Sequence, residues 1–244
     1  MNGASPDVTA GRLPGRSKVA IELIQRGYHR VAPLYDIVFG ASLQPGRRVA
    51  LAALDCRPGD RILEVCVGSG LSLPLFPAYV HVTGIDISRD MLARAAARIR
   101  TRRLSQVDGI LQMDAEYMAF ADASFDKAAV MYAISGLPDP ARGMREIQRV
   151  CRPDATIVIA SHFRSRRPLL RFCERLLSPI YRLLQYRTDL DLEEFIAEAP
   201  FDVLKVQRAN LFGYATVLVC RNRVTADSAR PSPSNHPGKS GSHG

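Results

Sequence analysis

The sequence predicts one large α/β domain built on a mostly parallel β-sheet. Apolar, strand-like runs alternate with helical patterns, and most of these runs end in a glycine, an acid or another polar residue. A chain of 244 residues that is 47% hydrophobic can bury a full core. Because parallel strands are joined by right-handed crossovers, this alternation predicts a ligand crevice at the carboxyl ends of the strands.

The N-terminal part is expected to lie outside this sheet. Residues 1–16 are predicted to be a flexible N-terminus, and residues 17–56 to form an amphipathic helical lid. Apolar residues recur there at helical spacing, and Pro33 should kink or restart the helix. A short helix over 47–54 then leads to the core domain, predicted over 57–221.

The first strand runs into a glycine turn, and the second ends in an acid. Arg61-Ile-Leu-Glu-Val65 is apolar, Gly68 and Gly70 follow it, and a strand over 80–85 ends at Asp86. The glycines let the backbone turn sharply and leave no side chain between it and a ligand. Asp86 can accept both hydrogens of a ribose diol. The pattern predicts a crevice for an adenosine-containing cofactor.

Two other nucleotide loops do not fit. No Gly-x-x-x-x-Gly-Lys-Ser/Thr motif is present, which argues against a phosphate-cradling loop. A dinucleotide loop needs a third glycine, but Leu71, Ser72 and Leu73 follow Gly70. The loop is therefore poorly suited to a pyrophosphate.

The later elements follow the same order. Ser88 is predicted to cap a helix whose arginines form its solvated side. Its apolar face is expected to comprise Met91, Leu92, Ala95, Ala96 and Ile99. A third strand over 109–113 ends at Asp114, and a doubly covered fourth strand spans 125–132.

The end of the domain is predicted to close the sheet. A helix over 140–151 precedes a fifth strand over 156–161, which ends at His162. Alternating runs over 203–209 and 214–220 predict an antiparallel hairpin. Residues 222–244 are rich in Ser, Pro, Gly and His and are predicted to be a disordered tail.

The cysteines and the termini limit the class of protein. Five scattered cysteines without Cys-x-x-Cys spacing argue against a disulfide framework and a zinc site, and no metal is expected. The first residues lack a signal-peptide pattern, and no run of eighteen apolar residues occurs. We therefore expect a cytoplasmic chain that does not span a membrane.

The net charge is +9, and the region 164–187 is especially basic. It holds seven arginines against one acid, Glu174, with aliphatic and aromatic residues between them. A basic amphipathic segment favours an anionic surface. Its aliphatic residues suit a membrane better than nucleic acid, so phospholipid is the expected partner and no nucleic acid is expected. Alternatively, the arginines only solvate the outer face of a core helix.

Several motifs together resemble the bacterial phosphatidylethanolamine N-methyltransferases, a family of class I S-adenosylmethionine-dependent methyltransferases. They are Leu63-Glu-Val-Cys-Val-Gly-Ser-Gly-Leu-Ser-Leu-Pro74, Gly84-Ile-Asp-Ile-Ser88 with Met91-Leu-Ala-Arg-Ala95, Tyr132-Ala-Ile-Ser135 and Ser161-His-Phe163. Tyr28-x-x-x-Ala-Pro-x-Tyr-Asp36 is shared with quinone C-methyltransferases. The resemblance covers roughly residues 20–220 and implies a Rossmann-like, seven-stranded sheet with a closing hairpin and an N-terminal lid. One departure is Cys66, which stands where the family motif has its first glycine.

The resemblance also implies roles for individual residues. S-adenosylmethionine would be the cofactor and S-adenosylhomocysteine the product. Glu64 would reach the amino-acid end of the cofactor, Asp86 the ribose hydroxyls and Asp114 the exocyclic amine of adenine. The implied cofactor-binding residues are Tyr35, Glu64, Cys66, Gly68, Gly70, Asp86, Ile87, Met91, Asp114, Ala115, Tyr132 and Ala133.

The implied reaction is displacement at a sulfonium methyl group by the amine of phosphatidylethanolamine, possibly up to phosphatidylcholine. Because that amine arrives as an ammonium ion, a proton must leave; His162 is a candidate acceptor, and Tyr28 or Tyr35 can orient the amine. We expect a peripheral enzyme at the inner face of the cell membrane. Two alternatives stay open: a methyltransferase for a quinone or another small molecule, and a noncatalytic cofactor-binding protein.

Overall fold

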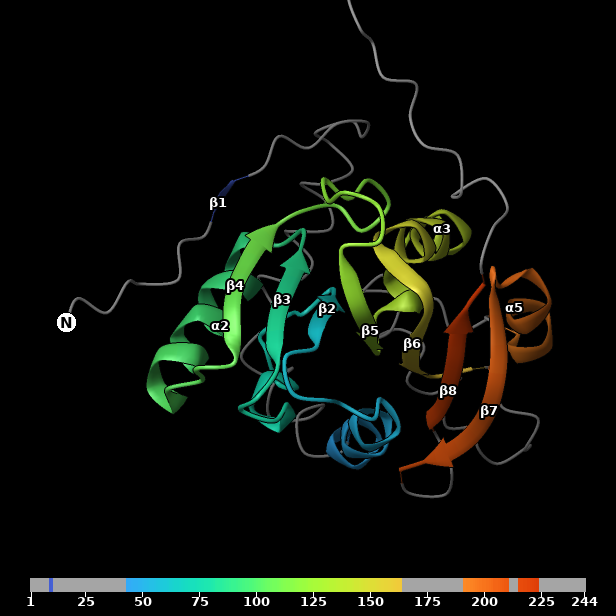
Figure 1. Ribbon diagram of the computed structural model, residues 1–244, viewed down its shortest axis with the longest axis horizontal. Helices are drawn as coiled ribbons and strands as arrows, with labels where there is room; N and C mark the ends of the chain where they lie inside the picture. The colour runs from blue at the N-terminus through green and yellow to red at the C-terminus, as the bar shows by residue number, and fades with distance from the viewer. Residues whose placement is uncertain (1–8, 11–42, 164–190, 211–214, 224–244) are drawn as a thin grey trace, which may run out of the picture.

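The computed structural model describes residues 9–10, 43–163, 191–210 and 215–223. In this part of the chain, eight strands form one sheet in the order β1-β4-β3-β2-β5-β6-β8-β7 (Figure 1). The strands are β1 (Thr9–Ala10), β2 (Arg61–Val65), β3 (His81–Asp86), β4 (Val107–Gln112), β5 (Phe125–Met131), β6 (Cys151–Ser161), β7 (Phe201–Ala209) and β8 (Ala215–Asn222).

The pairing confirms the predicted sheet. β2 lies at its centre and pairs in parallel with β3 and β5, and β4 and β6 extend the parallel part on either side. β8 is antiparallel to both β6 and β7, which is the predicted closing hairpin. The seven expected strands are β2 to β8, and β1 is an addition that pairs with β4.

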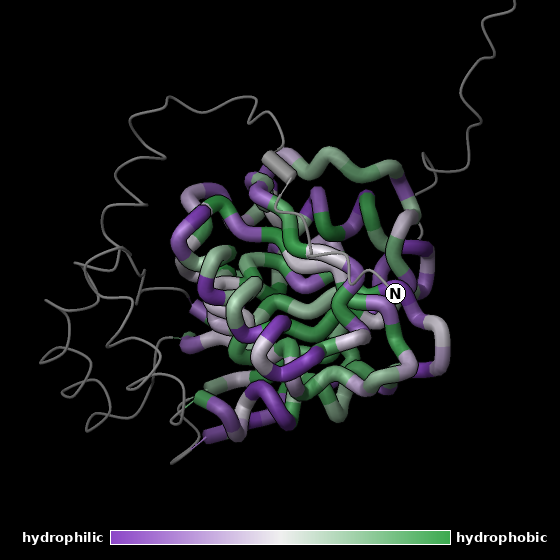
Figure 2. The backbone as a smooth tube through the Cα atoms, turned by 90° about the vertical axis from the view of Figure 1, so that its left-hand side faces the viewer, coloured by the Kyte–Doolittle hydropathy of each residue, from purple (hydrophilic) through white to green (hydrophobic). Residues whose placement is uncertain are grey.

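Helices cover both faces of the sheet. The helix over residues 43–53 and α2 (Arg89–Arg102) pack on one face, and α3 (Pro140–Val150) and α5 (Leu192–Glu198) pack on the other. Hydrophobic segments gather between these layers in Figure 2. The class I methyltransferase architecture predicted from the sequence is therefore present. The predicted lid residues before 43 and the tail after 223 lie outside the described residues.

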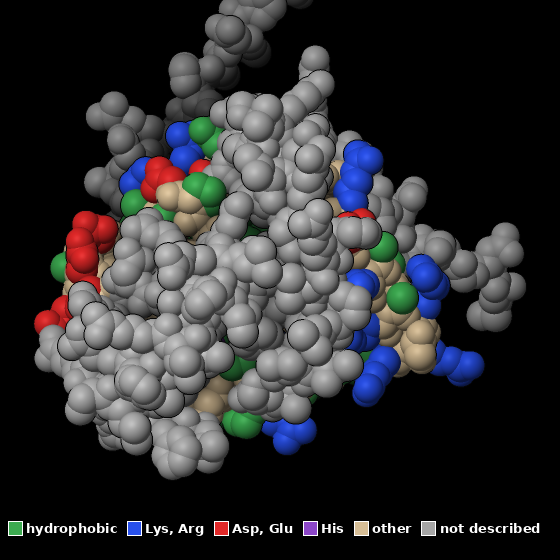
Figure 3. All heavy atoms as spheres, turned by 180° about the vertical axis from the view of Figure 1, so that it is seen from behind, with side chains coloured by type: hydrophobic (Ala, Val, Ile, Leu, Met, Phe, Trp, Pro, Cys, Tyr) green, Lys and Arg blue, Asp and Glu red, His purple; other side chains and the backbone are tan. Residues whose placement is uncertain are grey.

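α2 follows its sequence pattern closely. The Ser88 hydroxyl accepts the backbone N–H of Met91 at 3.4 Å, and Arg103 ends the helix in a left-handed conformation. All five residues of the predicted apolar face are buried. Many Lys and Arg side chains gather on the side of the molecule where α2 lies (Figure 3). None of the helices in the described ranges has the length and apolarity needed for a membrane span.

The first helix is anchored to the sheet by a buried lysine. The ammonium group of Lys127, on β5, donates to the carbonyl of Leu54 at 2.9 Å and to that of Asp55, and it pairs with Asp60 at 3.2 Å. These carbonyls lie at the C-terminal end of the helix, where the helix provides no partner for them. Lys127 therefore fixes the end of this helix to the start of a central strand.

The hairpin is anchored at its far end by Asn222. Its amide nitrogen donates to the carbonyls of Gln148, Cys151 and Arg152, each at 3.0 Å. These bonds lie at the start of β6. This strand begins at Cys151 and not at the predicted residue 156, because Phe125 of β5 pairs with Cys151 before the register between the two strands shifts. Asn222 therefore connects β8 to the junction of α3 and β6.

Candidate functional site

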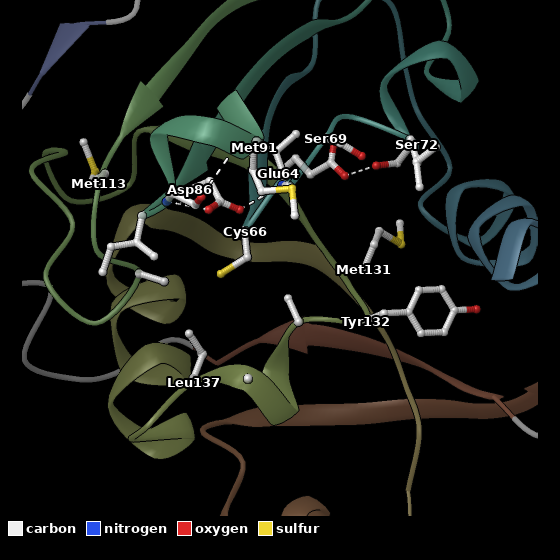
Figure 4. Close-up of a pocket in the computed structure, with 18 of the residues that line it drawn as sticks. Glu64, Cys66, Ser69, Ser72, Asp86, Met91, Met113, Met131, Tyr132 and Leu137 are labelled. Atoms are coloured by element: carbon white, nitrogen blue, oxygen red, sulfur yellow. Dashed lines mark hydrogen bonds between the residues drawn. The ribbon is translucent and has the colours of Figure 1, made fainter. Parts of the chain in front are cut away.

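A solvent-open cleft with an internal volume of about 110 Å³ lies at the carboxyl ends of the central strands (Figure 4). Ten of the cofactor-binding residues expected from the sequence line it, although they come from four different strand ends. They are Glu64, Cys66, Gly68, Asp86, Ile87, Met91, Asp114, Ala115, Tyr132 and Ala133. The topology therefore brings together almost all of the predicted cofactor residues that the structure describes.

The glycine turn forms the floor of the cleft. Cys66, Gly68 and Gly70 have φ angles of 54°, 56° and 74°, so each lies in the left-handed region. Gly70 is not among the lining residues. A Cβ added there would lie 2.8 Å from the Leu73 side chain and 3.2 Å from Ala95 on α2. Gly70 thus allows α2 to pack against the turn, while Gly68 leaves the cleft side open.

Asp86 connects the glycine turn to the start of α2. One carboxylate oxygen accepts the backbone N–H of Gly68 and the other that of Ser88, both at 2.8 Å. Burial raises the pKa of Asp86, and these backbone hydrogen bonds oppose the increase. A carboxylate has about four acceptor positions, so Asp86 keeps acceptor capacity for a ligand in the cleft beside its backbone hydrogen bonds. This arrangement fits a ribose diol.

Glu64 places a buried carboxylate at the other end of the cleft. Its side chain is 1% exposed, and one oxygen accepts the hydroxyl of Ser72. The second oxygen has no hydrogen-bond partner among the described residues. Burial raises the pKa of Glu64 to about 7, partly offset by the bond from Ser72 and the charge of Arg47. An unpartnered buried carboxylate oxygen fits a cationic, hydrogen-bond-donating group such as an ammonium.

Apolar side chains form the opposite end of the cleft. Ile87 and Met91 follow β3, and Met113 and Leu137 contribute from the loops after β4 and β5. Figure 4 shows Met113 on the side of Asp86 that is remote from Ser72, and Leu137 across the cleft from Asp86. Asp114 is 3% exposed and accepts the backbone N–H of Glu116 at 3.0 Å. A flat, polar-edged ring such as adenine matches these walls.

Arg47 is a lining residue that the sequence pattern did not predict. It is 4% exposed, and its guanidinium carbon lies 5.3 Å from the centre of the Tyr132 ring. It precedes the first core strand, so strand-end reasoning could not select it. Ser72 lies inside the glycine-loop motif but has no predicted cofactor role there, and Met113, Met131 and Leu137 lie next to motif residues without belonging to a motif. Arg47 and Glu64 bring opposite charges to the cleft.

The predicted catalytic residues are only partly described. The ring of His162 lies 5.1 Å from that of Tyr132, at the carboxyl ends of β6 and β5, but His162 is not among the residues that line the cleft. Tyr28 and Tyr35 lie outside the described residues. In the part of the chain that the structure covers, no group of three or more His, Cys, Asp or Glu side chains could hold a metal ion.

Methyltransferases are among the known proteins that are similar to this chain. A family model described as "Methyltransferase domain" matches residues 63–159. The phosphatidylethanolamine N-methyltransferase of Cereibacter sphaeroides is 36% identical over 203 residues, which cover 83% of this chain and 99% of that protein. The 2-phytyl-1,4-naphtoquinone methyltransferase of Synechococcus elongatus is 32% identical over 164 residues, or 64% of this chain and 70% of that protein.

A solved structure shares the fold. It is phospholethanolamine N-methyltransferase 2 of Haemonchus contortus in complex with phosphomonomethylethanolamine and S-adenosylhomocysteine. It is 22% identical, with a TM-score of 0.62, over 76% of this chain and 46% of that one. At this identity the likeness supports the architecture alone.

Proposed function

The chain belongs to the class I S-adenosylmethionine-dependent methyltransferases, in the phosphatidylethanolamine N-methyltransferase family, and we propose that its methyl acceptor is the amine of phosphatidylethanolamine. The observation that supports this substrate is the share of each relative's length that the chain matches. The relative that acts on phosphatidylethanolamine is matched over 99% of its length, whereas the quinone methyltransferase of Synechococcus elongatus is matched over 70%. The chain therefore shares nearly all of the former protein and only part of the latter.

The proposed cofactor, S-adenosylmethionine, supplies an electrophilic methyl group on a sulfonium sulfur. Asp86 accepts hydrogen bonds from its ribose hydroxyls, and Ile87, Met91, Met113 and Leu137 pack around its adenine. The free oxygen of Glu64 accepts from the α-ammonium, a role that its unpartnered state in the structure supports.

Arg47 is suited to the α-carboxylate of the same cofactor. It lines the cleft, and its positive charge lowers the pKa of Glu64, so the two charged groups lie near one another. A zwitterionic amino-acid group would present its ammonium to Glu64 and its carboxylate to Arg47. Glu64 and Arg47 thus define the amino-acid end of the cleft, and Asp86 lies between this end and the adenine end.

Methyl transfer to the lipid requires an unprotonated amine that is aligned with the cofactor. Alignment of two bound reactants can supply up to about 7–11 kcal/mol of the barrier reduction. Tyr132 and Ala133 form the wall next to which we place the acceptor, and His162 beside Tyr132 is the proposed proton acceptor. Tyr28 and Tyr35 are proposed to orient the amine, and their rings would favour methylated ammonium products.

We further propose that the enzyme works at the inner face of the cell membrane as a peripheral protein. The support is the arginine-rich, partly apolar composition of residues 164–187, which suits anionic phospholipid headgroups. That segment and residues 17–42 of the lid predicted over 17–56 lie outside the described residues.

A product-identifying assay tests the substrate. The purified protein is incubated with methyl-labelled S-adenosylmethionine and, in parallel, with vesicles of phosphatidylethanolamine mixed with an anionic phospholipid, or with a demethylated naphthoquinone. Labelled methylated phosphatidylethanolamine is the expected product. Transfer of label to the quinone alone would replace the proposal by the quinone alternative, which the 32% identity to a naphthoquinone methyltransferase favours.

A further inference from the structure

Asn210 joins three distant parts of the chain at one point. It directly follows β7, and its side-chain oxygen accepts the backbone N–H of Gly46 at 2.6 Å. Its side-chain nitrogen donates to the hydroxyl of Tyr132 at 3.1 Å. These partners lie 164 and 78 residues away in the sequence. One amide therefore connects the hairpin, the helix over 43–53 and the end of β5.

The residues around Asn210 pack closely, and hydrogen bonds join their polar groups at this contact. The Tyr132 hydroxyl, which accepts from Asn210, donates to the carbonyl of Leu43 at 3.2 Å. A Cβ on Gly46 would overlap that hydroxyl, so only glycine allows the helix to approach this closely. Figure 4 shows the hydroxyl of Tyr132 pointing away from Cys66 and Asp86, toward the helix. The ring of Tyr132 thus faces the cleft region while its polar end is held from behind.

One partner of Asn210 lines the cleft, and the other is adjacent in sequence to a residue that does. Tyr132 lines the cleft directly, and Gly46 precedes Arg47, which also lines it and lies against the Tyr132 ring. Arg47 and Glu64 carry the opposite charges assigned above to the amino-acid end of the cofactor. Movement of the start of the helix would displace Arg47, whereas Asp86 and the adenine walls lie on β3, α2 and the loops after β4 and β5.

We propose that Asn210 is a positioning residue for the amino-acid end of the cofactor site. Through its bonds to Gly46 and Tyr132 it sets where Arg47 and the Tyr132 ring stand, without contacting the cofactor itself. This inference rests on the proposed function, because it requires that the cleft binds S-adenosylmethionine or its product.

The test uses two ligands that differ only at that end. S-adenosylhomocysteine carries the amino-acid group, and 5′-methylthioadenosine has the same adenosine and sulfur without it. The variant is Asn210→Gly, which removes the amide and tolerates the φ of 64° at this position. Titration calorimetry should show about tenfold weaker binding of S-adenosylhomocysteine and less than about a twofold change for 5′-methylthioadenosine.

Asn222→Ala is the matched control. It removes an asparagine from the other end of the same hairpin, whose three bonds go to backbone carbonyls remote from the cleft. We expect Asn222→Ala to lower the Tm. The ratio of its affinities for the two ligands should equal the ratio in the unaltered protein. Asn210→Asp keeps an acceptor for Gly46 and can accept from the Tyr132 hydroxyl, so it should shift the ratio less than Asn210→Gly does.

Two sets of binding results would contradict the proposed role of Asn210. If Asn210→Gly binds both ligands as the unaltered protein does, or loses affinity for both equally, or if Asn210→Asp shifts the ratio as much as Asn210→Gly, the inference is wrong. If the unaltered protein binds neither ligand, the proposed cofactor is wrong, and the inference falls with it.

Discussion

Binding of S-adenosylhomocysteine at mildly acidic pH should release a proton from Glu64. Its pKa of about 7, against an ordinary value of 4.5, means that the free protein holds this carboxyl protonated below about pH 7. An ammonium group beside its free oxygen favours the ionised form, so the bound state has the lower pKa. Affinity should therefore rise as the pH increases from 5.5 toward about 7 and level off above it, by up to about tenfold per pH unit.

The same carboxyl makes the free protein less stable as pH rises. Glu64 ionises near 4.5 in the unfolded chain but only near 7 in the folded protein, so its contribution is fully present below 4.5 and is lost between these values. The difference corresponds to about 3 kcal/mol as an upper limit. Glu64→Gln should remove this pH dependence, which chemical denaturation of both proteins at pH 5 and pH 7.5 measures.

Calorimetry in two buffers with different ionisation enthalpies measures the released proton directly. At pH 6 the unaltered protein should release close to one proton per ligand, and at pH 8 almost none. Glu64→Gln should release none at either pH. In Ser72→Ala the pKa of Glu64 should rise further because the hydroxyl that stabilises the carboxylate is lost, which moves proton release to higher pH. Equal proton release by Glu64→Gln and the unaltered protein at pH 6 would refute the assignment of Glu64.

Three further outcomes follow from the structure. S-adenosylhomocysteine should slow alkylation of Cys66, which lines the cleft, but not of Cys56, which does not; equal protection in peptide mass spectrometry would contradict the placement of the cofactor. Lys127→Met should lower the free energy of unfolding by about 2–4 kcal/mol, because it leaves Asp60 and two helix-end carbonyls without their partner, and denaturation that shows no loss would contradict this. Gly70→Ala should destabilise the protein by about 1–3 kcal/mol through its positive φ and its close neighbours, and an unchanged Tm would show that the turn relaxes.

The strand order and most of the cleft could be predicted because they depend on local patterns. Apolar runs separated by helices mark β2 to β6, and their carboxyl ends meet at one edge by topology alone. Glu64, Asp86 and Asp114 were therefore expected to come together before any coordinates were considered. β1 has only two residues, too few for a periodic pattern, and β6 begins five residues early because of a pairing with Phe125 that sequence alone does not reveal.

The residues that were missed share one physical cause. Arg47 and Asn210 reach the site through contacts across more than 70 residues, and neither belongs to a strand end of the parallel sheet. The charge and the spacing of residues in the sequence do not reveal such contacts. Arg47 and Arg48 are adjacent and have the same charge, but only Arg47 lines the cleft. Only the packing of the helix over 43–53 against the sheet selects one arginine over the other.

The backbone angles support the view that this edge of the sheet is organised around a ligand. In the described residues, positive φ at Asp55 and Arg103 occurs just after helices, where left-handed residues commonly end them, and Ala123 and Asp154 have positive φ away from the cleft. Cys66, Tyr132 and Asn210 have no such role, and each such conformation costs about 1–3 kcal/mol. Two of them line the cleft, and the third is hydrogen-bonded to one of those two. Strain held at this edge by surrounding bonds is expected where a binding wall must keep one shape. Asn210 contributes to it by using both polar atoms of its side chain in bonds to Gly46 and Tyr132.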